Sequence, residues 1–114
     1  MNSQYVNEYS KYYIQNNENV SVERFLIELR KKNIINFLNS INHKNEVLQI
    51  GCGLEPLYTY YHELEHVTII EPNKEFIDIF KKTVPSHVEF INGYFEEVEL
   101  INHNYNAVVC SSVL

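Results

Sequence analysis

The stretch at residues 45–56, NEVLQIGCGLEP, limits the possible folds more than any other part of the chain. Val47 to Ile50 has the composition of a short buried strand, and Gly51-Cys52-Gly53 bends the chain directly after it. A helix from Pro56 to Glu65 is expected next, because proline is tolerated in the first turn, where its missing N–H costs nothing. A strand, a tight glycine turn and a helix in this order form a corner that holds nucleotides in α/β folds.

The chain after this corner predicts further strands that alternate with helices. The second strand, Val67 to Ile70, ends at Glu71-Pro72, because proline cannot continue a strand ladder. The segments expected next are a helix capped by Asn73 and running to about Thr83, a strand at 88–91, a short turn or helix at 95–100, and a strand at 105–110. Such alternation predicts an α/β, Rossmann-like parallel sheet with strand order 3-2-1-4, flanked by helices.

Residues 1–44 are predicted to form an N-terminal helical cap or lid. In residues 4–17, Tyr5, Tyr9 and Tyr12 have helical spacing, which fits either a helix on the domain edge or a movable aromatic lid. A second helix is expected from an N-cap at Ser21, with Val20 and Phe25 as a hydrophobic staple. Its apolar stripe would cover one face of the sheet; the stripe consists of Phe25, Leu26, Leu29, Ile34, Phe37, Leu38 and Ile41. The basic run at 30–32 is interpreted as a solvated helix face.

The composition restricts the class of partner. The 114 residues fit one domain or part of one, and the net charge of −6 argues against an obligate nucleic-acid or anionic-membrane partner. No signal peptide and no apolar run of about 20 residues is visible, so a cytoplasmic location is expected. Cys52 and Cys110 are interpreted as reduced, core-like thiols. The five histidines are scattered, so no metal site is expected.

The predicted topology gathers four loops at one edge of the sheet. Ligands of open α/β sheets bind outside the carboxyl ends of the strands at the topological switch point, here between the first and fourth strands. The loops are Gly51 to Gly53, Glu71, Gly93 to Phe95, and Cys110 to Ser112. Glu71 lies 20 residues after Gly51, where a carboxylate can accept ribose hydroxyls. The alternative is an exposed acid at a strand end.

The same corner argues against a phosphate-bearing ligand. The pattern G-x-G-x-x-G would need glycine where Pro56 stands, and no G-K-[ST] is present. Glu55 would lie at the helix N-terminus and repel a phosphate. A ligand with an adenosine, no phosphate and a positive centre fits better, and S-adenosyl-L-methionine has these properties.

Four segments carry a family resemblance: VLQIGCG, TIIEP, VEFINGYFEEV and YNAVVCSSVL. Together they resemble the first four motifs of class I S-adenosylmethionine-dependent methyltransferases, across residues 45–114. The resemblance implies that Gly51, Cys52 and Gly53 pass under the methionine and ribose, and that Glu71 holds the ribose diol. It further implies that Pro72 flanks the adenine, Tyr94 and Phe95 line the adenine edge, and the backbone carbonyls of Cys110 and Ser111 face the ammonium group.

The sequence departs from the family pattern at four positions. Gln49 replaces an acid that usually stands two residues before the first glycine, and Glu55 replaces a glycine. Tyr94 and Asn106 each stand where the family often has aspartate. Gln49 is kept among the candidate cofactor-binding residues, and Glu55 is expected to replace it in part as an acid near the ammonium.

These observations predict a methyltransferase that acts on a small-molecule acceptor, with S-adenosyl-L-methionine as cofactor. Alignment of the acceptor behind the methyl group would supply most of the catalysis, so no catalytic base is named. Cys52 is interpreted as a buried thiol in the turn, not a nucleophile. The alternatives are a non-catalytic binding or scaffolding domain and an enzyme that transfers another group of the same cofactor. The chain is expected to be the first half of a longer S-adenosylmethionine-binding domain, and the open fourth strand predicts marginal stability or self-association.

Overall fold

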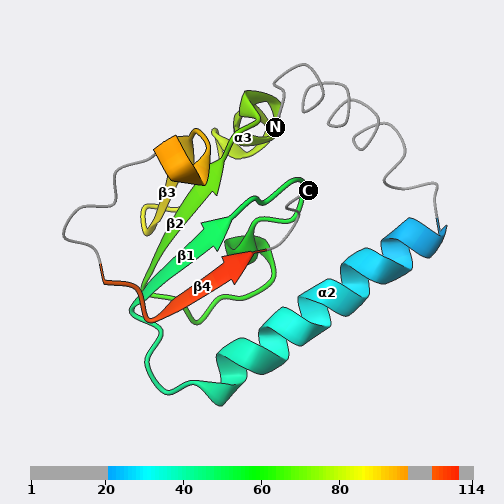
Figure 1. The fold of residues 1–114 in the computed structure, drawn as a ribbon, viewed down its shortest axis with the longest axis vertical. Helices are drawn as coiled ribbons and strands as arrows, with labels where there is room; N and C mark the ends of the chain where they lie inside the picture. The colour runs from blue at the N-terminus through cyan, green and yellow to red at the C-terminus, as the bar shows by residue number, and fades with distance from the viewer. Residues whose placement is uncertain (1–20, 98–103, 111–114) are drawn as a thin grey trace.

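The computed structural model describes residues 21–97 and 104–110, which form a four-stranded parallel sheet (Figure 1). Its order is β3-β2-β1-β4, which confirms the predicted topology and the α/β, Rossmann-like class. Val47 of β1 pairs with Val67 of β2 on one side and with Ala107 of β4 on the other. The strands are β1 (Glu46–Ile50), β2 (His66–Glu71), β3 (Val88–Asn92) and β4 (Ala107–Cys110).

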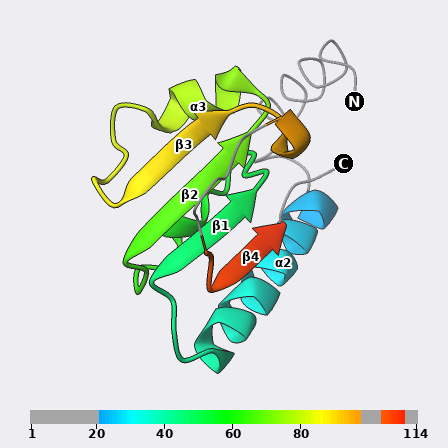
Figure 2. The same ribbon diagram turned by 60° about the vertical axis from the view of Figure 1, so that its left-hand side comes forward.

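Two α-helices, α2 (Ser21–Ser40) and α3 (Lys74–Phe80), lie on the same side of the sheet, behind it in Figure 2. The main core fills the space between the sheet and the elements behind it. It joins three groups of buried side chains: one face of the strands, the C-terminal part of α2, and the segment between β1 and β2. Strand alternation explains which face this is, since Val47, Val67 and Val109 belong to the core cluster whereas Leu48 and Ile70 do not.

The predicted helix from Pro56 to Glu65 is wrong. The structure has only a single 3-10 turn, η1 (Leu57–Thr59), after an extended Pro56, and residues 61–65 are not helical. Aromatic and β-branched residues in the run TYY favour a helix weakly. The place over β1 is also already filled by α2, whose Leu38 is fully buried in the same cluster as Leu57.

The predicted inner stripe of α2 is only partly correct. Ile34, Leu38 and Ile41 pack in or against the core, as expected. Four members of the stripe are instead exposed, namely Phe25, Leu26, Leu29 and Phe37. Ile27 is buried in their place, so this helix carries apolar residues on two faces. The expected cap and staple involve Val20, and Tyr5, Tyr9 and Tyr12 lie further upstream; these residues fall outside the described part.

The capping of α3 is confirmed. The Asn73 side chain accepts a hydrogen bond from the backbone N–H of Glu75 at 2.9 Å, and the helix ends at Phe80, earlier than expected. Phe76 on its inner side packs with Ile27 and Leu54 in a second, smaller cluster. The segment after β3 contains the 3-10 turn η2 (Phe95–Glu97), as predicted for that stretch. Within residues 21–97 and 104–110, no helix combines the length and apolarity that a bilayer crossing requires.

Candidate ligand-binding loops at the carboxyl ends of the strands

The glycine turn after β1 depends on two residues in the left-handed region of backbone space. Gly51 has φ 75° and Gly53 has φ 54°, values that a residue with a Cβ reaches only at a cost. The N–H of Gly51 donates to the carbonyl of Ile70 at 2.8 Å, so the ladder between β1 and β2 continues into the turn. The turn is therefore fixed against the end of β2, where Glu71 lies.

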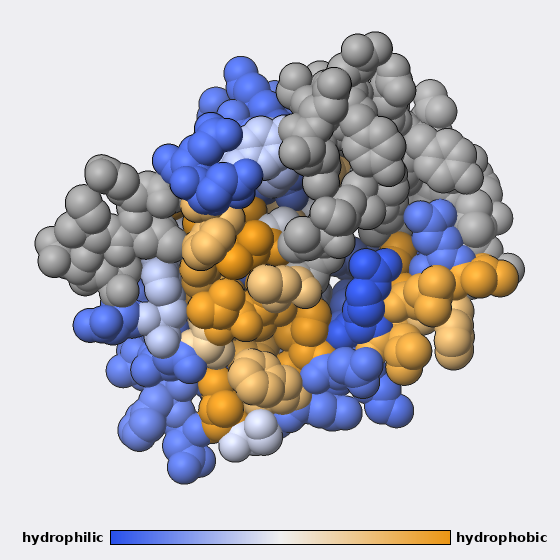
Figure 3. Space-filling view, in the orientation of Figure 1, coloured by the Kyte–Doolittle hydropathy of each residue, from blue (hydrophilic) through white to orange (hydrophobic). Residues whose placement is uncertain are grey.

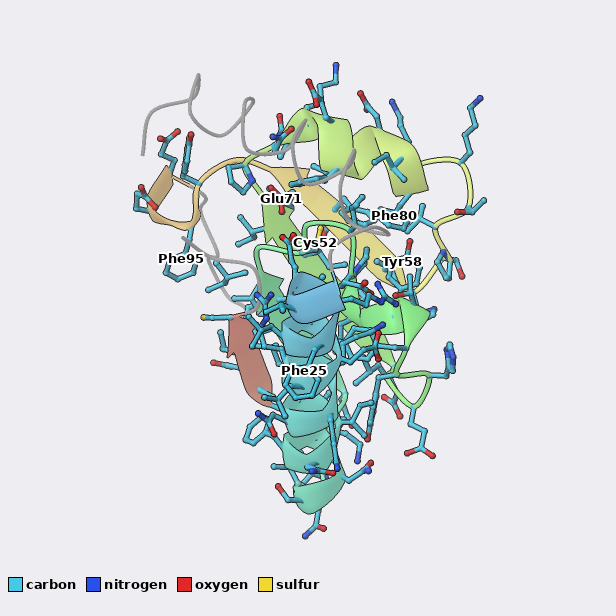
Figure 4. The ribbon with its side chains drawn as sticks, turned by 90° about the vertical axis from the view of Figure 1, so that its right-hand side faces the viewer. Phe25, Cys52, Tyr58, Glu71, Phe80 and Phe95 are labelled. Carbon is cyan, nitrogen blue, oxygen red and sulfur yellow. The ribbon has the colours of Figure 1, made fainter. Side chains whose placement is uncertain are left out.

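The Glu71 carboxylate ties the turn to the loop after β2. Its Oε1 accepts hydrogen bonds from the backbone N–H groups of Cys52 at 2.9 Å and Gly53 at 3.2 Å. Its Oε2 accepts from the N–H of Asn73 at 2.8 Å. Glu71 is only 3% exposed, so it is not an exposed acid at a strand end. Figure 4 shows Cys52 and Glu71 close together, with Phe95 set apart from them.

This arrangement has a chemical consequence. Consecutive backbone N–H groups in a glycine turn form the concavity that usually receives a phosphate. Here the amides of Cys52 and Gly53 already bind a carboxylate of the same chain. The turn as folded thus offers these two donors to no external anion.

Asn92 links the end of β3 to the loop that contains Glu71. It is not among the site residues predicted from the sequence. Its Nδ2 donates to the carbonyls of Glu71 at 3.0 Å and Pro72 at 3.2 Å. The N–H of Gly93 also donates to the Glu71 carbonyl at 3.1 Å. The predicted strand at 88–91 assigns no role to the Asn-Gly pair that follows it, although an asparagine beside a neighbouring strand end is well placed for such bonds.

Cys52 is a buried thiol, as predicted. Its Sγ donates to the carbonyl of Gly53 at 3.5 Å, and both burial and the neighbouring Glu71 charge raise the pKa of the thiol. Burial also raises the pKa of Tyr58, whose ring meets Phe90 edge-on at a centroid distance of 6.2 Å. Cys110 differs from the prediction, because it is exposed at the end of β4.

Gln49 is bonded to the loop between the glycine turn and η1. Its Oε1 accepts from the N–H of Leu57 at 2.8 Å, and its Nε2 donates to the carbonyl of Glu55 at 3.4 Å. It is fully buried. An amide can donate and accept at once, whereas an ionised acid can only accept. The glutamine at this position therefore fixes the loop from the glycine turn to η1.

Glu55 is an ion-pair partner of α2. Its Oε1 lies 3.2 Å from the Arg24 guanidinium and its Oε2 lies 3.0 Å from Lys31 Nζ. Lys31 Nζ also lies 5.2 Å from the centroid of the Tyr60 ring, and burial together with the Glu55 charge raises the pKa of Tyr60 to about 12. The interpretation of Lys31 as part of a solvated face was wrong, and the seven-residue spacing of Arg24 and Lys31 could have indicated their common face.

Two observations show that Glu55 does not repel a phosphate in the way that the sequence predicts. No α-helix begins near this residue, so there is no helix N-terminus to receive the anion. The Glu55 charge is also compensated by two cations. The occupied amides of the turn give a different reason for the same conclusion.

The other predicted residues lie at the same edge of the sheet or outside the described part. Pro72 and Tyr94 are half-buried, and Phe95 is exposed in η2. Cys110 pairs in register with Ile50, just before the glycine turn. Ser111 lies outside the described residues. Asn106 is at the opposite end of β4, where its side chain accepts from the N–H of Glu46 at 2.9 Å.

Comparison of the sequence with models of protein families and with curated proteins gives no match. Across the described ranges, no group of three or more His, Cys, Asp or Glu side chains is placed to hold a metal ion.

Proposed function

We propose that this chain is the S-adenosyl-L-methionine-binding part of a methyltransferase that acts on a small molecule. The observation that carries the proposal is the Glu71 carboxylate bound by the amides of the glycine turn, next to the switch point between β1 and β4. Ligands of open α/β sheets bind at this edge. A ligand for this site must contain few phosphates or none, because the amides that would hold them already have a partner.

The charge of the carboxylate favours a cationic ligand. A buried negative charge attracts a sulfonium or ammonium group more strongly than it would in water. A carboxylate has about four lone-pair positions, and three are engaged by the N–H groups of Cys52, Gly53 and Asn73. Glu71 therefore has capacity for one ribose hydroxyl through Oε2, rather than the symmetric grip on both hydroxyls that the resemblance implied.

The remaining contacts of the proposed complex would come from the other loops at this edge of the sheet. The backbone of Gly51 and Gly53 permits close approach of the methionine and ribose, because these residues have no side chain. Pro72 and Tyr94 would flank the adenine from the ends of β2 and β3, and the carbonyls at Cys110 and Ser111 would receive the ammonium. Catalysis would consist of holding the acceptor in line with the methyl group while water is excluded.

A non-catalytic binding or scaffolding role is the second candidate, and a specific observation favours it. Gln49, Glu55 and Asn106, three of the positions that depart from the family pattern, all bond to other parts of the chain. Side chains engaged in this way stabilise the fold without contributing to a ligand site. A purely scaffolding domain would not bind the cofactor, whereas a non-catalytic binding domain would bind it and transfer no methyl group.

Calorimetric titration tests the proposal. S-adenosylmethionine and S-adenosylhomocysteine should bind, whereas ATP and NAD should not. Tyr94→Ala should weaken binding about 2- to 12-fold, since an aromatic contact contributes about 0.5–1.5 kcal/mol. Phe37→Ala, which removes an exposed aromatic ring on α2, is the matched control and should leave affinity unchanged. Tighter binding of ATP would reject the methyl-donor assignment, and a folded protein that binds none of the four ligands would favour the scaffold.

A further inference from the structure

The outer side of α2 carries an apolar stripe that the described residues leave uncovered. Its members are large side chains with 44–70% of their surface exposed: Val22, Phe25, Leu26, Leu29 and Phe37. At about 3.6 residues per turn, Leu26 and Phe37 lie on the other side of the helix from Lys31, which pairs with Glu55 next to η1. Figure 4 shows β4 on one side of α2 and Tyr58 of η1 on the other. The stripe therefore extends from the outer surface of α2 toward the side where β4 lies.

The strand β4 forms the edge of the sheet on that same side. It pairs with β1, and no strand within residues 21–97 and 104–110 pairs with its other edge. Its sequence, AVVC, has neither the charge nor the proline that usually protects a sheet edge, and Val108 is 50% exposed. Figure 3 shows hydrophobic atoms gathered over β4 and along α2 on one face of the molecule. The stripe and β4 together are called the edge surface below.

The edge surface is complementary to a second copy of itself. Figures 1 and 2 show α2 running alongside β4 in the opposite direction. A two-fold axis perpendicular to both elements would pair β4 with its copy as antiparallel strands and place α2 beside its copy as an antiparallel helix. The positions 22, 26, 29 and 33 alternate spacings of four and three residues, the pattern of a seam between two helices. One two-fold contact thus covers both the strand edge and the stripe.

The distribution of charge permits this contact. The chain has a net charge of −6, so two copies repel each other unless the surfaces that meet lack acids. Neither β4 nor the stripe contains Asp or Glu. Of the acids in α2, Glu28 pairs with Arg24 and Lys31, and Glu23 is half-buried. The exposed Arg30, beside the stripe, offsets part of the net negative charge.

The area of the edge surface is sufficient for a dimer. A standard interface buries about 800 Å² on each partner. A phenylalanine offers about 150–250 Å² when wholly exposed, and a valine or leucine side chain about 60–120 Å². With the exposed fractions of the stripe and Val108, the edge surface presents about 300–500 Å² of apolar side chain. Because apolar atoms make up about 56–65% of an interface, the whole contact would bury about 500–900 Å² on each copy, a range that includes the standard size.

We propose that this chain forms a two-fold dimer through the edge surface. The strand β4 of one copy continues the sheet into β4 of the other, and the two α2 helices pack side by side. This gives the self-association expected of an open fourth strand a defined geometry. The proposal is independent of which ligand the carboxyl ends of the strands bind.

Sedimentation velocity of the full chain tests the dimer. At about 100 μM the chain should sediment with twice its mass, since interfaces of standard size hold complexes of micromolar affinity or tighter. Val108→Lys on the strand edge and Leu29→Glu on the stripe should each raise the dissociation constant at least tenfold. Neither should change the circular dichroism spectrum, because both side chains are exposed in a single copy. Ile79→Glu is the matched control and should leave the dimer unchanged, since Ile79 is 48% exposed but lies on α3.

Several outcomes of this experiment would overturn the proposal. A monomer at this concentration would assign the edge surface to another occupant. A mass that rises beyond two copies would also contradict it, because a two-fold contact closes on itself. An unchanged dimer of Val108→Lys would place the contact away from β4, and an unchanged dimer of Leu29→Glu would place it away from the stripe. An equal effect of Ile79→Glu would indicate association without a defined surface.

A symmetric cross-link tests the packing of the two α2 helices. The stripe spans positions 22–37, so its centre, at 29 and 30, would lie at the two-fold axis. In a Cys110→Ser background, in which the buried Cys52 stays, Arg30→Cys is treated with a short bismaleimide. Its yield of a product of twice the chain mass should be at least tenfold higher than that of Asp78→Cys, an exposed position on α3. Equal yields would contradict the antiparallel helix pair.

Discussion

Replacement of Glu71 by glutamine tests the central contact of the site. Glutamine has the same shape but only one acceptor oxygen, so it can serve the amides of Cys52 and Gly53 or the amide of Asn73, not both. At least one of these buried backbone N–H groups then loses its acceptor and faces the NH₂ group of the glutamine side chain. A hydrogen bond to a charged group is worth about 1.5–3 kcal/mol, and an unsatisfied donor costs about 1–3 kcal/mol. Relief of the carboxylate's own desolvation offsets part of this, which leaves an expected loss of about 2 kcal/mol.

The assay for this prediction is urea unfolding followed by circular dichroism. A loss of this size is a substantial part of the total stability of about 5–15 kcal/mol and should appear as a lower midpoint at unchanged slope. Glu89→Gln on β3 is the matched control, because Glu89 is also a strand residue but is exposed, and its effect should stay within about 0.5 kcal/mol. If Glu71→Gln is as neutral as the control, the carboxylate does not hold the turn and the reasoning about occupied amides fails.

Three further predictions concern the surroundings of the turn. With a thiol reagent at mildly alkaline pH, Cys110 should react at once and Cys52 only on unfolding, since Cys52 is buried and its thiol pKa is raised; two equally fast thiols would contradict this burial. Gln49→Glu should lower the unfolding free energy by about 2 kcal/mol or more, because it removes the donor to the Glu55 carbonyl and buries a charge. An unchanged urea midpoint would contradict the core position of Gln49. The pKa of Tyr60 is raised from 10.0 to about 12, so the folded state holds its proton over this interval. The contribution of Tyr60 to the unfolding free energy should therefore be constant below pH 10 and fall between about pH 10 and 12. Urea unfolding at several pH values should show that Tyr60→Phe loses less stability over this interval.

Local patterns were sufficient to predict much of the fold. The strands were located from short apolar runs, of which the first ends at the glycine turn, the second at Pro72 and the third at Asn92-Gly93. The order 3-2-1-4 follows from right-handed crossovers. The cap at Asn73 and the closeness of Glu71 to the glycine turn were also predictable, since both depend on short spacings or on the ends of adjacent strands. In each case the determining interaction lies within one element or between paired strands.

The features of the structure that the sequence did not predict depend on contacts between residues that are distant in sequence. The sequence of Pro56 and the tyrosines after it is compatible with a helix. The packing of α2 over β1, which excludes that helix, cannot be seen in the local sequence. Glu55 seemed an isolated acid because its two cations lie 24 and 31 residues upstream at Lys31 and Arg24. Sequence spacing alone cannot decide which face of a helix with two apolar sides turns inward.

Gln49, Glu55 and Asn106, at which the sequence departs from the pattern that it resembles, each make contacts that stabilise the fold. Gln49 and Glu71 hold the two sides of the loop from the glycine turn to η1, one through an amide and the other through a carboxylate. A turn fixed in this way is ordered before any ligand arrives, and preorganisation lowers the entropic cost of binding. The buried amide of Gln49 fixes this loop through one donated and one accepted hydrogen bond, a combination that an ionised acid at this position could not make. A scaffold would need the same rigidity, so stability measurements do not distinguish it from a cofactor-binding domain, whereas direct titration with the methyl donor does.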